Sequence, residues 1–371
     1  CVFSTPLVGS LLKASEETMP QAGWARLLAR WGTALLRCLP AEMAHDIGMA
    51  VLQRRVLEYL PAPTASQKMA GLQVTIPGIG ALPHPIGLAA GFDKNCLCPQ
   101  GFARMGFSFL EAGTVTPMPQ EGNPKPRLFR YRSQRALINR MGFNNHGALA
   151  VADRIRKLDW SHDRVPLGIN LGKNKITPNE EAVSDYKDGY EAFAGLGRYY
   201  VINISSPNTP GLRDLASPDF VGLLADQFGP SNLPKIWVKI DPDLPRREFQ
   251  ELVAAIASRG FQGLILSNTH RVAWPEPGGL SGHPLATLST SRLEWAYEVH
   301  RGELPMIASG GILCGSDIVE KVIRGAVGVQ IYTALAYGGP YVVAELLEQL
   351  AQELKLRGFE CLEDAVGTYY A

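Results

Sequence analysis

The sequence predicts an α/β fold, a closed (β/α)8 TIM barrel with an N-terminal hairpin of two amphipathic helices. Eight short apolar runs alternate with segments of helical periodicity between residues 86 and 331. These runs do not alternate polar and apolar residues, which is typical of parallel strands buried on both faces. An open doubly wound sheet is the alternative, but the GxGxxG turn that opens many such sheets is missing from the sequence.

The chain divides into three predicted parts. Residues 1–20 show no regular pattern and are expected to be irregular, residues 21–62 hold the two amphipathic helices, and residues 63–371 form the barrel domain. The chain starts at Cys1 rather than at a methionine, so we expect that something upstream was removed.

The two predicted helices each carry an apolar face. Trp24, Leu27 and Trp31 recur at steps of three and four residues, Pro40 ends this helix, and a second helix closes before Pro61. Tryptophans and arginines on a short amphipathic hairpin are typical of a segment that lies in a membrane interface. Packing of both helices against the barrel explains the pattern equally well, so both explanations stay open.

The barrel can be predicted element by element. A small hairpin (residues 72–76 and 81–82) precedes it, and a second hairpin (127–131 and 136–139) is inserted after the second strand. The predicted strands are residues 86–90, 109–115, 167–171, 199–204, 236–240, 263–266, 306–308 and 327–331. Helical intervals include residues 148–157, 185–194, 246–258, 290–300 and 316–324.

The composition argues against several classes of protein. Lys and Arg number 36 against 35 Asp and Glu, so no global charge points to a nucleic-acid partner. The six cysteines form no CxxC pair and the seven histidines no HExxH pattern. We therefore expect free thiols, a reducing compartment and no metal. No apolar run reaches the roughly 18 residues that a membrane-spanning helix needs.

Polar side chains gather where the predicted strands end. The fourth strand runs into the segment 203–211, which holds two asparagines, two serines and two prolines. Lys94, Asn170, Lys239 and Asn268 lie at the ends of other strands. Each of these residues alone has an ordinary explanation as a helix cap or loop former. In a barrel, however, all the strands end at one rim, where catalytic groups collect.

This set of side chains indicates a flat, polar, anionic ligand. Gly310 and Gly311 follow the seventh strand and could offer backbone N–H groups to a phosphate. Lys239 inside an apolar strand is costly to bury without an anionic partner, and a ring that becomes anionic on reduction would provide one. Rim carboxylates are almost absent, which argues against glycosidases and metal hydrolases. A flavin mononucleotide (FMN) enzyme acting on a small amide ring fits best.

Long motifs also give the chain a resemblance to a known family. They are GLAAGFDKN (87–95), GTVTP (113–117), GNPKPRLFR (122–130), INRMGFN (138–144), GINLGKN (168–174), NISSPNTPG (203–211), GGLSG (278–282) and QIYT (330–333). With these motifs in order, the chain resembles the class 2 dihydroorotate dehydrogenases from about Ala44 to the C-terminal helix. The resemblance implies oxidation of dihydroorotate to orotate in pyrimidine (UMP) biosynthesis, with FMN as cofactor and ubiquinone as electron acceptor.

The resemblance further implies roles for individual residues. Ser206 would be the general base that takes a proton from C5 of dihydroorotate while hydride leaves C6; class 1 relatives have a cysteine there. The substrate would be bound by Lys94, Asn139, Arg140, Met141, Gly142, Phe143, Asn203, Asn208, Asn268 and Thr269. FMN would be held by Ala90, Gly91, Lys94, Thr114, Asn170, Asn203, Lys239, Ser267, Gly282, Gly311, Tyr332 and Thr333. A quinone tunnel formed with the two helices would be lined by Arg130, Tyr332, Leu36 and His45.

Some segments depart from the family pattern. Residues 267–270 are Ser-Asn-Thr-His where many relatives have Thr-Asn-Thr-Thr, and residues 309–311 are Ser-Gly-Gly in place of a valine-bearing version. Leu36 stands where some relatives place a glutamine in the tunnel, so the contacts of tunnel inhibitors are not carried over. A serine is also a poor base by itself, and the sequence does not identify the group that relays its proton.

The resemblance implies contact with a membrane surface through the N-terminal helices and a monomeric enzyme. It places the protein at the mitochondrial inner membrane or, alternatively, at a bacterial cytoplasmic membrane. Two other functions stay open. One is a related flavin barrel that uses nicotinamide and another cyclic amide, and the other is a membrane-docked binding protein that has lost turnover.

Overall fold

The computed structural model of the chain describes residues 21–61, 71–208 and 211–371. Its centre is a closed barrel of eight strands: β3 (Ile86–Leu88), β4 (Phe109–Val115), β7 (Leu167–Leu171), β8 (Tyr199–Asn203), β9 (Ile236–Ile240), β10 (Gly263–Leu266), β13 (Met306–Ser309) and β14 (Ala326–Ile331). Neighbouring strands are parallel, and β14 pairs with β3 to close the ring. The predicted barrel is confirmed. β4, β7, β8 and β9 are buried at every position, which explains why their sequences do not alternate.

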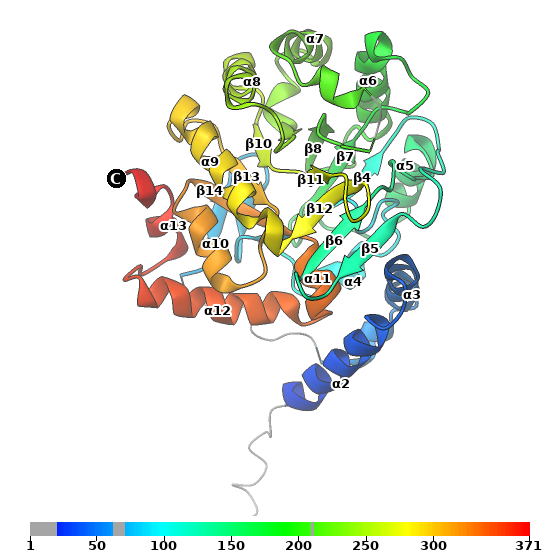
Figure 1. The fold of residues 1–371 in the computed structure, drawn as a ribbon, viewed down its shortest axis with the longest axis vertical. Coiled ribbons are helices and arrows are strands. Elements are labelled where there is room, and N and C mark those ends of the chain that lie inside the picture. Colours follow the sequence, from blue (N-terminus) through cyan, green and yellow to red (C-terminus); the bar gives the residue numbers. More distant parts are fainter. Residues whose placement is uncertain (1–20, 62–70, 209–210) are drawn as a thin grey trace, which may run out of the picture.

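Helices surround the barrel (Figure 1). They include α5 (Ala148–Arg156), α6 (Ala182–Ala192), α7 (Pro218–Phe228), α8 (Arg246–Arg259), α9 (Ala286–His300) and α10 (Gly315–Val322), and α11 (Thr333–Gly338), α12 (Val342–Leu356) and α13 (Leu362–Ala365) follow the last strand. The sequence pattern does not predict α7 and the short α4 (Pro99–Arg104). Each starts with a proline, which is tolerated in the first turn of a helix but resembles a loop signal in the sequence.

A hairpin of β1 (Val74–Ile76) and β2 (Gly80–Leu82) precedes the barrel, as predicted. Arg198, which directly precedes β8, donates to the carbonyl of Ile79 (3.0 Å). Ile76 lies against β14, where a methyl group on Gly328 would be 2.5 Å from its Cδ1 atom. The hairpin therefore packs at the amino ends of the strands, away from the rim where the candidate site residues gather.

A four-stranded antiparallel sheet stands at the opposite, carboxyl ends of the barrel strands. It has the order β11 (His270–Val272), β12 (Gly278–Gly282), β6 (Ala136–Asn139) and β5 (Leu128–Tyr131). The sequence predicted β5 and β6 but not β11 and β12. Gly279 packs against Thr269 and Pro207, so this sheet reaches the loop that follows β8.

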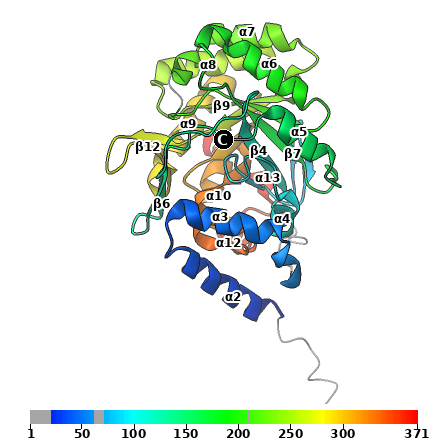
Figure 2. The ribbon, with the colours of Figure 1, turned by 90° about the vertical axis from the view of Figure 1, so that its right-hand side faces the viewer.

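The N-terminal helices α2 (Gln21–Leu36) and α3 (Ala41–Gln53), followed by a 3-10 turn (Val56–Tyr59), form a layer beside the barrel, near α12 (Figure 2). Two ion pairs hold α2 on α12: Arg26 with Glu348 (2.7 Å) and Arg30 with Glu345 (2.9 Å). α3 is held through Glu42, which pairs with Arg127 (3.0 Å). No helix in the described residues is long and apolar enough to cross a membrane. The predicted irregular segment, residues 1–20, lies outside the described residues.

Candidate active site

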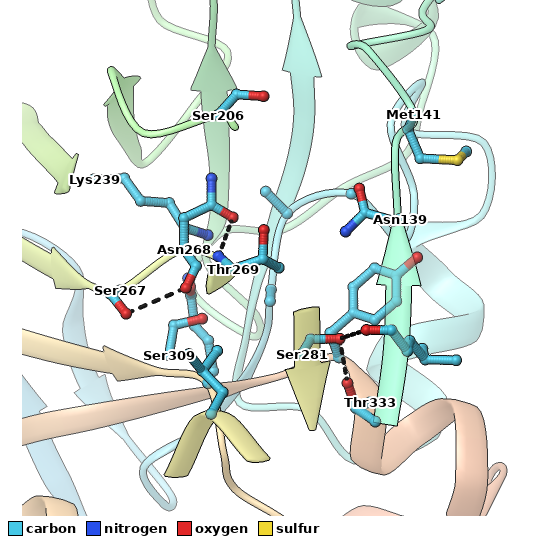
Figure 3. Close-up of a pocket in the computed structure, with 18 of the residues that line it drawn as sticks. Asn139, Met141, Ser206, Lys239, Ser267, Asn268, Thr269, Ser281, Ser309 and Thr333 are labelled. Atoms are coloured by element: carbon cyan, nitrogen blue, oxygen red, sulfur yellow. Dashed lines mark hydrogen bonds between the residues drawn. The ribbon is translucent and has the colours of Figure 1, made fainter. Parts of the chain in front are cut away.

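A cavity opens at the carboxyl ends of the barrel strands, bordered by β6 and β12 (Figure 3). Its wall combines glycine backbone, apolar side chains and a small number of polar groups, which is typical of small-molecule and cofactor sites. Most of the predicted site residues line it: Ala90, Gly91, Lys94, Thr114, Asn139, Met141, Gly142, Phe143, Asn203, Ser206, Lys239, Ser267, Asn268, Thr269, Gly282, Gly311, Tyr332 and Thr333. Residues far apart in the sequence thus meet in one place.

Ser206 lies in the loop that follows β8. Pro207 follows it directly and keeps this segment out of the regular ladder. The side chain is 4% exposed and belongs to the cavity wall, beyond Lys239 and Asn268 in the view of Figure 3. Its Oγ atom accepts a hydrogen bond from the backbone N–H of Asn208 (3.3 Å), so the hydroxyl hydrogen stays available for a ligand.

Asparagine side chains surround this part of the cavity. Asn208 Nδ2 donates to Asn139 Oδ1 (3.2 Å), and Asn139 Nδ2 donates to the carbonyl of Gly279 (3.2 Å). Asn268 Nδ2 donates to Ser205 Oγ (2.9 Å). These bonds fix the directions in which the amides present donors and acceptors to the cavity.

Lys94 supplies a positive charge on the same side. Its ammonium donates to the carbonyl of Gly91 (2.8 Å) and keeps two further hydrogens for other partners. Burial, followed by the positive charge of Arg127, lowers the pKa of Lys94 to about 8. The side chain is therefore mostly cationic at neutral pH and suits a ligand carboxylate.

Three residues predicted to contact ligands do not line the cavity. Arg140 pairs with Glu276 (2.8 Å) and lies over the Phe129 ring (4.5 Å), because successive side chains of an extended segment point to opposite faces. Asn208 holds Asn139 in place instead. Asn170 is fully buried beneath the cavity floor. These three residues support the wall rather than form it.

A chain of hydrogen bonds runs beneath the floor of the cavity. Glu111 on β4 is fully buried and accepts from Asn170 Nδ2 (2.7 Å) and Gln330 Nε2 (2.5 Å). Because an ionised carboxylate only accepts, Asn170 Oδ1 faces the other way, where it accepts from Thr114 Oγ1 (2.5 Å) and Asn203 Nδ2 (3.1 Å). Glu111 therefore fixes the orientation of both Asn170 and Asn203.

Lys239 on β9 is the buried cation of this cavity, with 5% of its surface exposed. Burial lowers its pKa, and the negative charge of Glu111 acts in the opposite direction. No hydrogen bond to its ammonium occurs in the described part of the chain, so its three N–H groups remain available to a ligand. The only signal of Glu111 in the sequence is that it is a lone carboxylate within the apolar run 109–115, which does not reveal that it lies near Lys239.

Replacing Glu111 with glutamine is expected to destabilise the protein. The amide would leave Lys239 without its counter-charge and would set an N–H group against the donor amide of Asn170 or Gln330. A buried polar group left facing another donor costs roughly 1 to 3 kcal/mol, a loss to be measured as the free energy of unfolding in urea at neutral pH. The double variant Glu111→Gln/Lys239→Met should lose less than the sum of the single variants; simple additivity would contradict this coupling.

The other end of the cavity is built from glycine backbone. Gly310 and Gly311 follow β13 with φ values of 105° and 74°, conformations that favour glycine. A Cβ atom on Gly311 would lie 2.2 Å from the Cα atom of Ala286. Nearby, the Thr333 hydroxyl donates to Ser281 Oγ (2.9 Å). Backbone N–H groups and a hydroxyl at a glycine-lined wall suit a phosphate group.

A second cavity lies between α2, α3 and the barrel. The four residues predicted for the quinone tunnel all line it: Leu36, His45, Arg130 and Tyr332. Most of its other residues are apolar. Burial lowers the pKa of His45 to about 3, so its imidazole is neutral and adds no charge. Arg130 donates to the carbonyls of Arg37 (2.9 Å) and Leu39 (3.0 Å), which ties the end of α2 to β5.

The two cavities are neighbours. Leu128, Leu137 and Tyr332 border both of them, so one layer of side chains separates the polar cavity from the apolar one. The described residues contain no group of three or more His, Cys, Asp or Glu side chains that could hold a metal ion.

Comparison with known proteins identifies the family. The family model described as dihydroorotate dehydrogenase matches residues 71–354. The dihydroorotate dehydrogenase (quinone) of Myxococcus xanthus is 42% identical over 353 residues, covering 90% of this chain and 96% of that protein. The mitochondrial dihydroorotate dehydrogenase (quinone) of Mus musculus is 41% identical over 356 residues, covering 90% and 88%. The crystal structure of ligand-free type DHODH from Eimeria tenella matches with a TM-score of 0.82 at 36% identity, covering 89% of this chain and 99% of that one. The chain therefore belongs to the dihydroorotate dehydrogenase family, in its quinone-dependent class 2.

Proposed function

We propose that this chain oxidises dihydroorotate to orotate, a step of pyrimidine biosynthesis, with FMN as bound redox carrier and ubiquinone as electron acceptor. The observation that carries the proposal is the pair of adjacent cavities. One is polar and has Ser206 and Lys239 in its wall, and the other is apolar and borders the first through a single layer of side chains. Relatives from bacteria and mouse are named for this dehydrogenase with a quinone.

The polar cavity fits FMN in two respects. Gly311 and Thr333, at its glycine end, would hold the phosphate. Lys239 would lie beside the ring edge that gains negative charge on reduction, where a buried cation is most stabilising. Asn170 would act indirectly, by orienting Thr114 and Asn203 at the floor. When bound, FMN supplies the acceptor for the hydride that leaves C6 of dihydroorotate.

The remaining polar side chains match dihydroorotate. Its carboxylate would pair with the cationic Lys94, and its ring amides would pair with Asn139 and Asn268. Ser206 Oγ would take the proton from C5. The N–H group of Asn208, which donates to this oxygen, would stabilise the negative charge that Oγ carries in its deprotonated form.

The apolar cavity suits a quinone, and the outer face of α2 suits a membrane surface. Trp24, Trp31 and Leu35 are 51%, 64% and 69% exposed, while the arginines of the same helix pair with α12. An exposed apolar face on an amphipathic helix lies in the interfacial region of a bilayer. We infer peripheral attachment to a mitochondrial inner membrane or a bacterial cytoplasmic membrane, through which a hydrophobic acceptor reaches the cavity.

The proposal is tested by an absorbance spectrum of the purified protein under anaerobic conditions. We expect a yellow protein whose flavin absorbance is bleached by dihydroorotate and restored by a short-chain ubiquinone. Bleaching by NADH instead would favour a flavin barrel with another cyclic substrate. A colourless protein that takes up no FMN would favour a binding protein without turnover.

A further inference from the structure

The structure contains another buried lysine, outside the cavity wall. Lys321 on α10 is 1% exposed. Its ammonium donates to three oxygen atoms of the first turns of α9: the carbonyl of Ala286 (3.1 Å), Ser289 Oγ (2.6 Å) and Thr290 Oγ1 (2.5 Å). All three acceptors are neutral, and no carboxylate in the described residues forms an ion pair with this lysine. The protein therefore buries a cation with complete hydrogen bonding but without a direct counter-charge.

Ser289 connects this ammonium to the glycine end of the polar cavity. An ammonium group only donates, so Ser289 Oγ accepts from Lys321 and its own hydrogen is free to be donated. Two carbonyls lie within reach of this hydroxyl: that of Gly310 at 2.8 Å and that of Ala286, which already accepts from Lys321, at 3.1 Å. The Gly310 carbonyl is the closer of the two and the one without the ammonium as a donor. Ser289 is fully buried, so water does not compete for either bond. The carbonyl of Gly310 is thereby held towards α9.

The direction of this carbonyl fixes the direction of the next N–H group. In a trans peptide the C=O and the N–H of one plane point to opposite sides. Because the Gly310 carbonyl points back to Ser289, the Gly311 N–H points away from α9. Gly310 and Gly311 both line the cavity, and the described backbone offers this N–H no hydrogen-bond partner.

We propose that Lys321, acting through Ser289, is a positioning residue for the phosphate end of the cavity. It holds the Gly310–Gly311 peptide so that the Gly311 N–H is presented to a phosphate monoester. This inference rests on the proposed function, because the phosphate is that of FMN. Because Lys321 is charged, it polarises the Ser289 hydroxyl and, through it, the Gly310–Gly311 peptide. This strengthens the hydrogen bond from the Gly311 N–H to the phosphate.

The surroundings of Lys321 are consistent with a role towards an anion. Burial lowers its pKa to about 7, and of the nearby charges Asp317, Glu320 and Glu294 act to raise it while Arg324 acts to lower it. A phosphate dianion at the far end of the relay would favour the protonated lysine. The ammonium and the anion would then stabilise each other across three hydrogen bonds, from Lys321 to Ser289, from Ser289 to the Gly310 carbonyl and from the Gly311 N–H to the phosphate.

The test compares FMN with riboflavin, which has the same ring system but no phosphate. Affinities for the flavin-free full-length protein are measured by quenching of flavin fluorescence. For Lys321→Met and for Ser289→Ala we expect FMN to bind roughly 10- to 100-fold more weakly, the range for a lost charge-assisted hydrogen bond. Riboflavin affinity should stay within about twofold, because ring contacts are unchanged. Thr290→Val is the control, since it removes an acceptor of the same ammonium that does not touch Gly310.

Each outcome bears on the inference. An equal loss of FMN and riboflavin affinity in Ser289→Ala, or no loss of either, would overturn it and leave Lys321 with a structural role only. If Lys321→Met does not fold, Ser289→Ala decides alone, since it removes one oxygen atom and leaves the lysine in place. An unmodified protein that binds neither flavin would instead overturn the proposed function, and with it this inference.

Discussion

Ser206→Ala is expected to keep the flavin but to slow its reduction by dihydroorotate by roughly 10²- to 10⁴-fold at neutral pH, the usual contribution of a positioned general base. The flavin should stay bound because, in the described residues, the only hydrogen bond of the Ser206 hydroxyl is the one it accepts from the backbone N–H of Asn208. The measurement is stopped-flow bleaching of the flavin absorbance without oxygen.

The Ser206→Cys variant provides the matched comparison. A thiol has a pKa of about 8.5 and can act as a base of its own, so this variant should recover part of the rate, increasingly as pH rises through that value. Near-normal bleaching by Ser206→Ala would show that another group takes the C5 proton. Loss of the flavin itself would mean that Ser206 has a structural role.

Gly48→Phe is expected to separate the two half-reactions. Gly48 on α3 lines the apolar cavity, and a Cβ atom there meets no atom within 4 Å, so a phenyl ring can enter the space without a backbone clash. Turnover with ubiquinone should fall by roughly 100-fold because the acceptor can no longer approach. Bleaching by dihydroorotate in the absence of quinone should stay within about twofold, since the polar cavity is untouched.

Gly23→Phe is the control for this change. Gly23 lies on the neighbouring helix α2, also has open space around its Cα atom, and does not line the cavity. It should leave both half-reactions unchanged. If Gly48→Phe impaired both half-reactions equally, or neither, the apolar cavity would not be the route of the quinone.

The barrel and most of the cavity wall could be predicted because they depend on local pattern. A strand buried on both faces is continuously apolar, and the residues at its carboxyl end must lie at the rim. The strands β11 and β12 could not be predicted in this way. Both are short and prolines separate them, and β12 is rich in glycine. β11 pairs only with β12, and β12 pairs with β6, which lies some 140 residues away in the sequence, as the bond from Asn139 to Gly279 illustrates.

The parts that depend on closure of the barrel were also missed. Glu111, Asn170 and Gln330 lie on three different strands and form one network only because β4, β7 and β14 face a common interior. Asn208 and Arg140 are next to cavity residues in the sequence but do not line the cavity themselves. The side chain of Asn208 donates to Asn139 in the wall, and that of Arg140 pairs with Glu276, which only the three-dimensional arrangement reveals.

The thin partition formed by Leu128, Leu137 and Tyr332 has a consequence for the chemistry of the whole molecule. A water-soluble acid and a hydrophobic acceptor would occupy separate cavities with separate entrances. The entrance of the polar cavity would face the aqueous phase, and that of the apolar cavity would face the lipid. Reducing equivalents, two electrons for each quinone together with the two protons of the quinol, would pass from the substrate to the acceptor without the two molecules meeting. A ligand that fills one cavity would then leave the other accessible. The protein would couple oxidation of a water-soluble substrate to reduction of a membrane-soluble acceptor.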